Sequence, residues 1–163
     1  MVVRNYVPQD LQSCRALWRE LTDWHRGIYR DTTIGGDQPE KYFDKHLAAI
    51  GPKQIWVAVH DARIVGLVGL ILGEDEAEVE PLIVSETYRG KGIGTRLINK
   101  AMTEAHVRGR RILSIKPVAR NIKTIQFLHR QGFTNIGHME LFMDFSERSW
   151  KPGPQMFRRK FRI

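Results

Sequence analysis

Apolar residues near the start of the chain recur every three or four positions, a spacing that predicts an amphipathic helix over residues 9–26. Its apolar stripe consists of Leu11, Cys14, Leu17, Trp18, Leu21 and Ile28. A second stripe of the same period predicts a helix over residues 37–50. Asp37 is the expected N-cap of this second helix, with Glu40 reaching back to complete a capping box.

Runs rich in Val, Ile and Leu follow these helices and predict β-strands. They cover residues 54–60, 64–72, 78–84, 111–116 and 133–145, the last run being one long strand or a pair of strands. A helix that begins near Ile93 and a short helix over residues 121–130 alternate with the later strands. This order of elements has no repeat and no low-complexity linker, so it predicts a single mixed α/β domain over residues 1–163.

The composition excludes several classes of protein. A chain of 163 residues buries enough surface to form a core without disulfides or a structural metal. Its one cysteine, Cys14, cannot form an internal disulfide, and no zinc-site spacing is present, so we expect no metal and a reducing compartment. The sequence shows neither a signal-peptide pattern nor an apolar run long enough to span a bilayer, and a cytoplasmic protein without membrane contact is therefore expected.

Charge is distributed unevenly along the chain. The 26 Lys and Arg residues exceed the 18 Asp and Glu residues, which gives a formal net charge of +8. Residues 1–80 carry 9 basic and 13 acidic side chains, whereas residues 81–163 carry 17 and 5. A basic half of this kind suits either a nucleic acid or a polyanionic small molecule, and net charge does not distinguish the two.

The segment Arg89-Gly-Lys-Gly-Ile-Gly-Thr95 is the most informative part of the sequence, because it follows an apolar strand and opens an amphipathic helix. Its glycines allow a tight turn and let an anion approach the backbone closely. The start of the helix adds about half a positive charge, and Arg89 and Lys91 add two full charges. The segment therefore predicts a phosphate-binding loop, the alternative being a glycine-rich turn with solvated basic residues.

This loop resembles the acetyl-CoA loop of the GCN5-related N-acetyltransferases (GNAT), written [QR]-x-x-G-x-[GA], in which Arg89, Gly92 and Gly94 fill the defined positions. The resemblance extends from Val2 to about Phe145. It implies an α/β (α+β) fold with a mixed, mostly antiparallel central sheet that is splayed at the acetyl-CoA site and flanked by about four helices. It also implies acetyl-CoA as co-substrate and no metal.

The resemblance assigns the cofactor contacts to two segments and one further residue. The strand backbone at positions matching Leu82, Ile83 and Val84 would bind the pantetheine arm and the thioester carbonyl. The pyrophosphate would lie on the loop, and the expected cofactor-binding residues there are Arg89, Gly90, Lys91, Gly92, Ile93, Gly94 and Thr95. Asn121 matches a residue that contacts the cofactor, and it also suits the N-cap of the helix over residues 121–130.

Amide formation requires a neutral amine, so a base or a water chain must remove a proton. Glu78 and Glu80 lie on one face of the strand that ends at the expected thioester position, and we favour Glu78 because it matches a catalytic position of the resembled family. An exposed strand face is the alternative for both. The tyrosine acid of many relatives is replaced here by Leu128, so Tyr88, another hydroxyl or water would protonate the thiolate, or it leaves as the anion.

The acceptor amine is expected to bind at the first two helices and the loop between them, where the resembled family builds its variable pocket. Tyr29 and Asp31 are the candidate substrate-binding residues. The acidic first half of the chain favours a small cationic primary amine, similar to an aminoglycoside or a polyamine, with a protein amine as the other possibility.

The rival interpretation is a non-catalytic module that binds nucleic acid or a protein partner through the basic C-terminal half. Residues 150–162 interleave aromatic and basic side chains, which would stack bases and neutralise phosphates. For residues 146–163 we favour a last strand, or a tail that supports a homodimer, over a nucleic-acid or partner-binding segment. Nucleic acid is therefore not expected as a partner.

Overall fold

The computed structural model describes residues 1–146 and 148–163. The chain falls into two compact units, Met1–Lys116 and Pro117–Ile163. The first unit contains a five-stranded sheet, and the second contains a helix and a two-stranded sheet. No helix within the described residues is long and apolar enough to cross a membrane.

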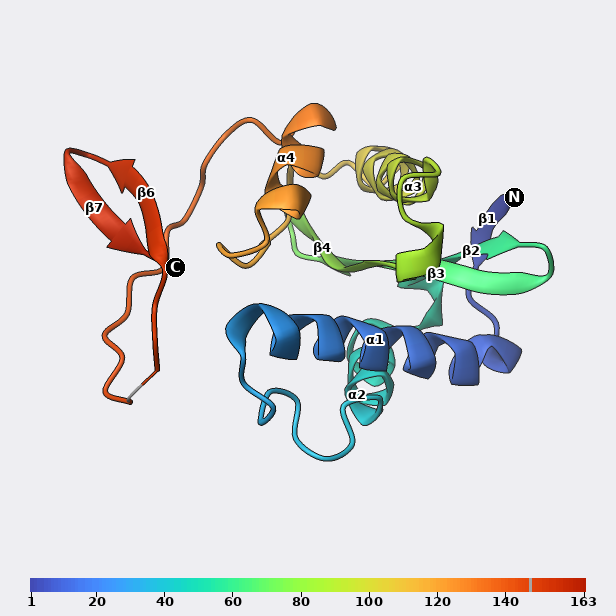
Figure 1. The fold of residues 1–163 in the computed structure, drawn as a ribbon. Coiled ribbons are helices and arrows are strands. Elements are labelled where there is room, and N and C mark those ends of the chain that lie inside the picture. Colours follow the sequence, from blue (N-terminus) through green and yellow to red (C-terminus); the bar gives the residue numbers. More distant parts are fainter. Residues whose placement is uncertain (147) are drawn as a thin grey trace. The chain divides into compact units, whose positions relative to one another are not determined.

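The sheet of the first unit has the strand order β1-β2-β3-β4-β5. Its strands are β1 Val2–Asn5, β2 Ile55–His60, β3 Arg63–Leu72, β4 Glu76–Val84 and β5 Ile112–Ser114. Every neighbouring pair is antiparallel except β4 and β5, which run parallel. Helices α1 (Leu11–Tyr29) and α2 (Lys41–Ile50) cover one face of the sheet, and α3 (Ile93–Val107) covers the other (Figure 1).

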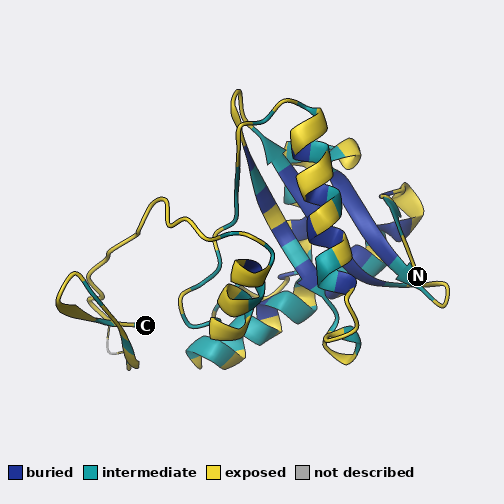
Figure 2. Cartoon of the chain, turned by 90° about the horizontal axis from the view of Figure 1, so that it is seen from above, coloured by how far each residue is buried: buried dark blue, intermediate teal, exposed yellow. Residues whose placement is uncertain are grey.

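The core of the first unit forms where the central strands meet these helices. Residues Ile55 to Ala58 of β2 are fully buried, which explains why this strand is apolar on both faces. Helix α1 buries Cys14 and Leu17, and α2 buries Phe43. Figure 2 shows this burial concentrated in the strands, while the outward face of α3 is exposed.

The N-terminal strand β1 was missed by the sequence analysis because it is short and contains Arg4 and Asn5. It pairs with β2 along its whole length. Arg4 donates two hydrogen bonds to the buried carboxylate of Asp10, at 2.7 and 2.9 Å, and the Val7 N–H donates a third. The bonds from Arg4 lower the pKa of Asp10 and tie β1 to the start of α1.

The second helix begins later than predicted. Asp37 does not cap it: α2 starts at Lys41, and Glu40 occupies the N-cap position without a side-chain cap bond. The intervening Pro39 accounts for the difference, because the residue before a proline is disfavoured in the helical conformation. The prediction for the first helix was closer, since a 3-10 turn over Pro8–Asp10 leads into α1.

A β-bulge in β4 changes the direction of the strand. The register between β3 and β4 passes from Val68↔Leu82 to Leu70↔Val79, which leaves two residues of β4 opposite Gly69. A Cβ atom at Gly69 would lie 2.2 Å from the backbone oxygen of Glu80. The bulge therefore brings the two backbones so close that only glycine fits.

Strands β4 and β5 separate soon after they meet. Their pairing covers Glu76↔Ile112, Ala77↔Leu113 and Glu78↔Ser114 and ends there. Beyond Glu78, β4 has no partner on this side within the residues that the structure describes. The mixed, mostly antiparallel and splayed sheet confirms the fold class expected from the sequence.

The second unit contains α4 (Ile122–Arg130) and a hairpin of β6 (Pro152–Met156) and β7 (Arg159–Arg162). The strand predicted over residues 133–145 is wrong, because none of these residues is in a strand. Its apolar side chains lack strict alternation, and the exposed ones include Ile136, Leu141, Phe142, Met143 and Phe145. A strand requires a hydrogen-bonded neighbour, and the apolar content alone does not supply one.

The close approach at the bulge gives a test of the fold. Replacing Gly69 with Ala should destabilise the protein by about 2 kcal/mol or more, because the new methyl group meets the Glu80 backbone. Gly27→Ala is the matched control: a Cβ there meets nothing within 4 Å, so Ala should stabilise α1 by about 0.5–1 kcal/mol. Urea unfolding measures both, and wild-type stability of Gly69→Ala would contradict the bulge geometry.

Candidate functional site

The predicted phosphate loop has an open, glycine-lined surface at the start of α3. Gly90 and Gly92 adopt φ angles of 75° and 76°, in the left-handed region that favours glycine, and Gly92 is the N-cap of α3. A Cβ atom at either position would meet nothing within 4 Å. The first N–H groups of a helix have no intrahelical acceptor, so the amides of Ile93, Gly94 and Thr95 are available to an anion.

The side chains of the loop differ in their roles. Ile93 is buried and packs in the core, so only its backbone can serve a ligand. The Nζ atom of Lys91 lies 4.9 Å from the ring centre of Tyr88, and Lys91 is exposed. Arg89 is occupied within the protein: its Nε–H donates to the Val84 carbonyl at 3.1 Å, and its guanidinium lies 4.5 Å from the Trp24 ring centre.

The end of β4 leads directly into this loop. Leu82 and Val84 are half-buried, whereas Ile83 between them is buried in the core. The three residues pair with β3 on one side, and they lie beyond the last pair of β4 with β5. The separation of the two parallel strands leaves this stretch of backbone available on its β5 side.

Glu78 and Glu80 share the face of β4 opposite to its buried residues, as the sequence predicted. Glu78 forms an ion pair with Lys116, whose Nζ lies 2.6 Å from Oε2, and this hydrogen bond raises the pKa of Lys116. Glu80 is exposed, and within the described part of the chain its carboxylate has no ion pair. The two carboxylates therefore differ in how readily they can meet an incoming ammonium group.

The candidate acceptor residues lie where α1 ends. Tyr29 is the last residue of α1 and is half-buried. Asp31 shapes the following loop, because its Oδ1 accepts hydrogen bonds from the N–H of Thr33 at 2.9 Å and from the Thr33 hydroxyl at 2.5 Å. Arg26 holds the same loop by donating to the backbone oxygens of Ile34 and Gly36.

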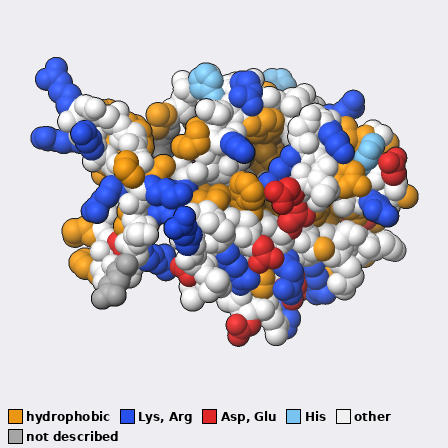
Figure 3. Space-filling view, viewed as in Figure 1, with side chains coloured by type: hydrophobic (Ala, Val, Ile, Leu, Met, Phe, Trp, Pro, Cys, Tyr) orange, Lys and Arg blue, Asp and Glu red, His pale blue; other side chains and the backbone are white. Residues whose placement is uncertain are grey.

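A groove of about 900 Å³ runs along α1 and was not found from the sequence. Its lining combines one face of α1 with parts of two other segments, and includes Ala16, Glu20, Asp23, Trp24, Gly27, Glu40, Lys41, Glu86 and Arg89. Acidic and basic side chains are intermixed on this side of the protein (Figure 3). The α1 residues among the lining residues recur at helical spacing, so the sequence could have indicated that they share one face of the helix. It does not indicate which other segments that face meets.

Asn121 belongs to the second unit and caps α4. Its side chain accepts a hydrogen bond from the Thr124 N–H at 3.2 Å, which confirms the capping role. Leu128, which the sequence analysis placed at the position of the tyrosine acid, lies in the same helix and is buried. In the first unit, Trp18 packs against Phe43 and His46, as expected for a core aromatic.

Comparison with known proteins identifies the family. Residues 18–133 match the model of the Acetyltransferase (GNAT) family. An uncharacterized N-acetyltransferase from Methanocaldococcus jannaschii is 46% identical over 57 residues, which cover 35% of this chain and 25% of that protein. The match thus spans about a quarter of the length of this curated relative.

Solved structures share the fold. A tetramutant of the BH1408 protein from Bacillus halodurans is 19% identical with a TM-score of 0.72, covering 88% of this chain and 100% of that one. PaiA N-acetyltransferase from Thermoplasma acidophilum, solved with coenzyme A, is 22% identical with a TM-score of 0.70, covering 79% and 86%. AAC(6')-Iy, solved with a bisubstrate analogue, is 12% identical with a TM-score of 0.63, covering 89% and 98%.

These likenesses below 25% identity establish the fold, and the family match establishes the lineage. The matched region contains α3, the glycine loop before it and the splayed strand β4. Since the family model covers more than half of the chain, the protein belongs to the GNAT family of acetyltransferases.

Proposed function

We propose that this protein transfers an acetyl group from acetyl-CoA to a primary amine, with the amine attacking the thioester directly. The observation that carries the proposal is the open glycine loop at the N-terminus of α3, placed at the end of a strand that has parted from its neighbour. This arrangement offers backbone amides to a pyrophosphate and an unpaired strand edge to the amide groups of a pantetheine arm.

The residues present fit acetyl-CoA. The amides of the Gly90–Thr95 loop and the exposed Lys91 would hold the pyrophosphate, and the backbone of Leu82, Ile83 and Val84 would hold the arm. Acetyl-CoA supplies the activated acetyl group as a thioester. Arg89 would act through the conformation of the loop, because its charge already lies against Trp24.

For the acceptor we propose a small cationic amine that approaches the acidic face of β4, with Tyr29 and Asp31 contributing to its pocket. The complex of AAC(6')-Iy with an analogue of acetylneamine supports an amine of this kind. The ion pair with Lys116 leaves Glu78 engaged, so the exposed Glu80 is better placed to take a proton from the ammonium group, with Glu78 orienting it. Asn121 remains a proposed cofactor contact in addition to its capping role.

Substitution of Gly92 tests the phosphate loop. Both Gly92→Ala and Gly92→Asn should weaken coenzyme A binding about tenfold, because a side chain enters the space an anion would use. Asn tolerates a positive φ better than Ala does. A similar loss of affinity in both variants would therefore indicate obstruction of the anion rather than backbone strain. Gly109→Ala is the control, since Gly109 has a φ of 71° at the other end of α3. Calorimetric affinities equal to wild type in folded Gly92 variants would contradict the site.

Substitution of the two carboxylates tests the base. If Glu80 takes the proton, Glu80→Gln should lower kcat by roughly 10²-fold and remove an ionisation from the pH profile of kcat/KM. Glu78→Gln should raise the KM for the amine and leave kcat nearly intact. Lys116→Met controls for loss of the ion pair, and it should retain kcat. Wild-type kcat and pH profile in both Gln variants would assign proton removal to water.

Substitution of Cys14 tests whether the amine attacks the thioester directly, without an acetyl-enzyme. Burial raises the pKa of its thiol to about 12, so the thiolate that an acetyl-enzyme would require is scarcely formed near neutral pH. Cys14→Ala should therefore keep most of the turnover, apart from a modest loss of stability. An acetylated protein mass that depends on Cys14, together with loss of activity in a folded variant, would instead support a two-step route.

A further inference from the structure

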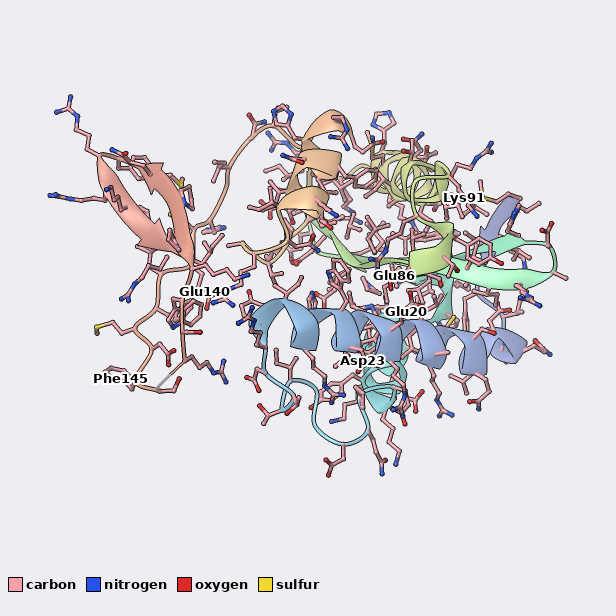
Figure 4. All side chains as sticks on the ribbon, viewed as in Figure 1. Glu20, Asp23, Glu86, Lys91, Glu140 and Phe145 are labelled. Carbon is pink, nitrogen blue, oxygen red and sulfur yellow. The ribbon has the colours of Figure 1, made fainter. Side chains whose placement is uncertain are left out.

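The short segment between β4 and the phosphate loop is held by side chains from α1. The carboxylate of Glu20 accepts a hydrogen bond from the N–H of Glu86, the first residue of the 3-10 turn η3 (Glu86–Tyr88). Figure 4 shows Glu20 and Glu86 next to each other between α1 and η3. This bond joins residues 66 positions apart, and it fixes the backbone four residues before Gly90.

A second contact from α1 reaches the residue that precedes the glycines. The guanidinium of Arg89 stacks over Trp24, one helical turn after Glu20, with 4.5 Å from Cζ to the ring centre. The same side chain donates to the backbone oxygen of Val84, so it links the last residue of β4 to α1. Glu20 thus contacts the first residue of η3, and Trp24 contacts its C-cap residue, Arg89.

These contacts add to the backbone bonds of the 3-10 turn and to the packing of Tyr88 against His60, and most of the segment is otherwise exposed. Glu86, Thr87, Arg89, Gly90, Lys91 and Gly92 are all exposed. Glycines lose more conformational freedom on ordering than other residues do, which makes a glycine loop costly to fix at the moment of binding. Contacts that fix it beforehand lower this cost and raise the affinity for the ligand.

We propose that Glu20 and Trp24 are positioning residues that hold the phosphate loop in its binding conformation. The proposal rests on the proposed binding of acetyl-CoA at this loop. The two residues act through the Glu86 backbone and the Arg89 side chain. Their effect is accordingly on coenzyme A affinity rather than on the proton-transfer step.

Substitutions at Glu20 test the first contact. Glu20→Ala should raise the Kd of coenzyme A about tenfold, as expected for loss of a hydrogen bond to a charged group. Glu20→Gln keeps an oxygen that can accept from the Glu86 N–H and should recover most of the affinity. Hydrogen exchange of the Glu86 amide should accelerate in the Ala variant and remain slower in the Gln variant.

Arg19→Ala is the matched control on the same helix. Arg19 forms an ion pair with Glu40 at 2.7 Å, and Glu40 is not part of the loop, so this variant loses an α1 contact of similar kind. It should leave the Kd of coenzyme A unchanged. A purely structural role of Glu20 would lower the thermal midpoint in both variants without separating their affinities.

Substitutions at Trp24 test the second contact. Trp24→Leu should raise the Kd of coenzyme A several-fold, whereas Trp24→Phe keeps a ring face for Arg89 and should retain most of the affinity. Combining Trp24→Leu with Arg89→Leu should add little to the effect of Arg89→Leu alone, because Arg89→Leu already removes the contact with Trp24. Fully additive effects would show that Trp24 acts by another route.

The outcomes separate this inference from the proposed function. A wild-type protein that does not bind coenzyme A overturns the proposed function and, with it, this inference. A wild type that binds, together with a Glu20→Ala variant that binds equally well, overturns the inference alone. If Glu20→Ala does not fold, Glu20→Gln and Trp24→Phe are compared with wild type instead. Both variants should bind coenzyme A within about threefold of wild type and keep the Glu86 amide protected from exchange. A variant that loses this protection but binds with unchanged affinity contradicts the inference.

Discussion

The arrangement of the site depends on one constraint, the contact between the backbone of Gly69 and the Glu80 carbonyl at the bulge of β4. Two residues of β4 occupy the space opposite one residue of β3, and a bulge of this kind bends the strand and increases its twist. The pairing with β5 ends just before the bulge, after Glu78. A glycine on a neighbouring strand therefore accompanies the separation of the two parallel strands on which the proposed acetyl-CoA site is built.

The proposed phosphate site in the loop that follows β4 would depend on backbone geometry more than on net charge. Arg89 is engaged by Trp24 and Val84, so the charge it contributes to a phosphate is smaller than the sequence suggested. In the proposed site the remaining attraction would come from the helix N-terminus, worth about half a charge, and from the exposed Lys91. Exposed charges are screened by salt over about 8–10 Å, whereas amides fixed against the ligand are not. The overall charge of +8 is thus a poor guide to this site.

The sequence predicted those features that are encoded locally. The loop was found because strand, glycines and helix follow one another directly, and α1 and α3 because their apolar stripes are regular. The contacts of Glu20 with Glu86 and of Lys116 with Glu78 join residues 66 and 38 positions apart, and no local pattern encodes which partner each side chain meets. Residues 133–145 show the converse error. Their apolar content indicated a strand, but none of them is in a strand, because strand formation depends on a neighbour to pair with.

The place of the Lys116–Glu78 ion pair explains why two glutamates on one strand face are not equivalent. Glu78 pairs with Ser114 in the last register position that β4 shares with β5, and Lys116 follows β5 by two residues. The ion pair consequently lies where the strands begin to part, and it keeps Glu78 next to a cation that the proposed ammonium substrate would have to displace or share. Glu80 lies beyond this point, on the separated part of the strand. The two carboxylates therefore differ in their contact with Lys116, which donates a hydrogen bond to Glu78 and acts on Glu80 only through the interaction of their charges.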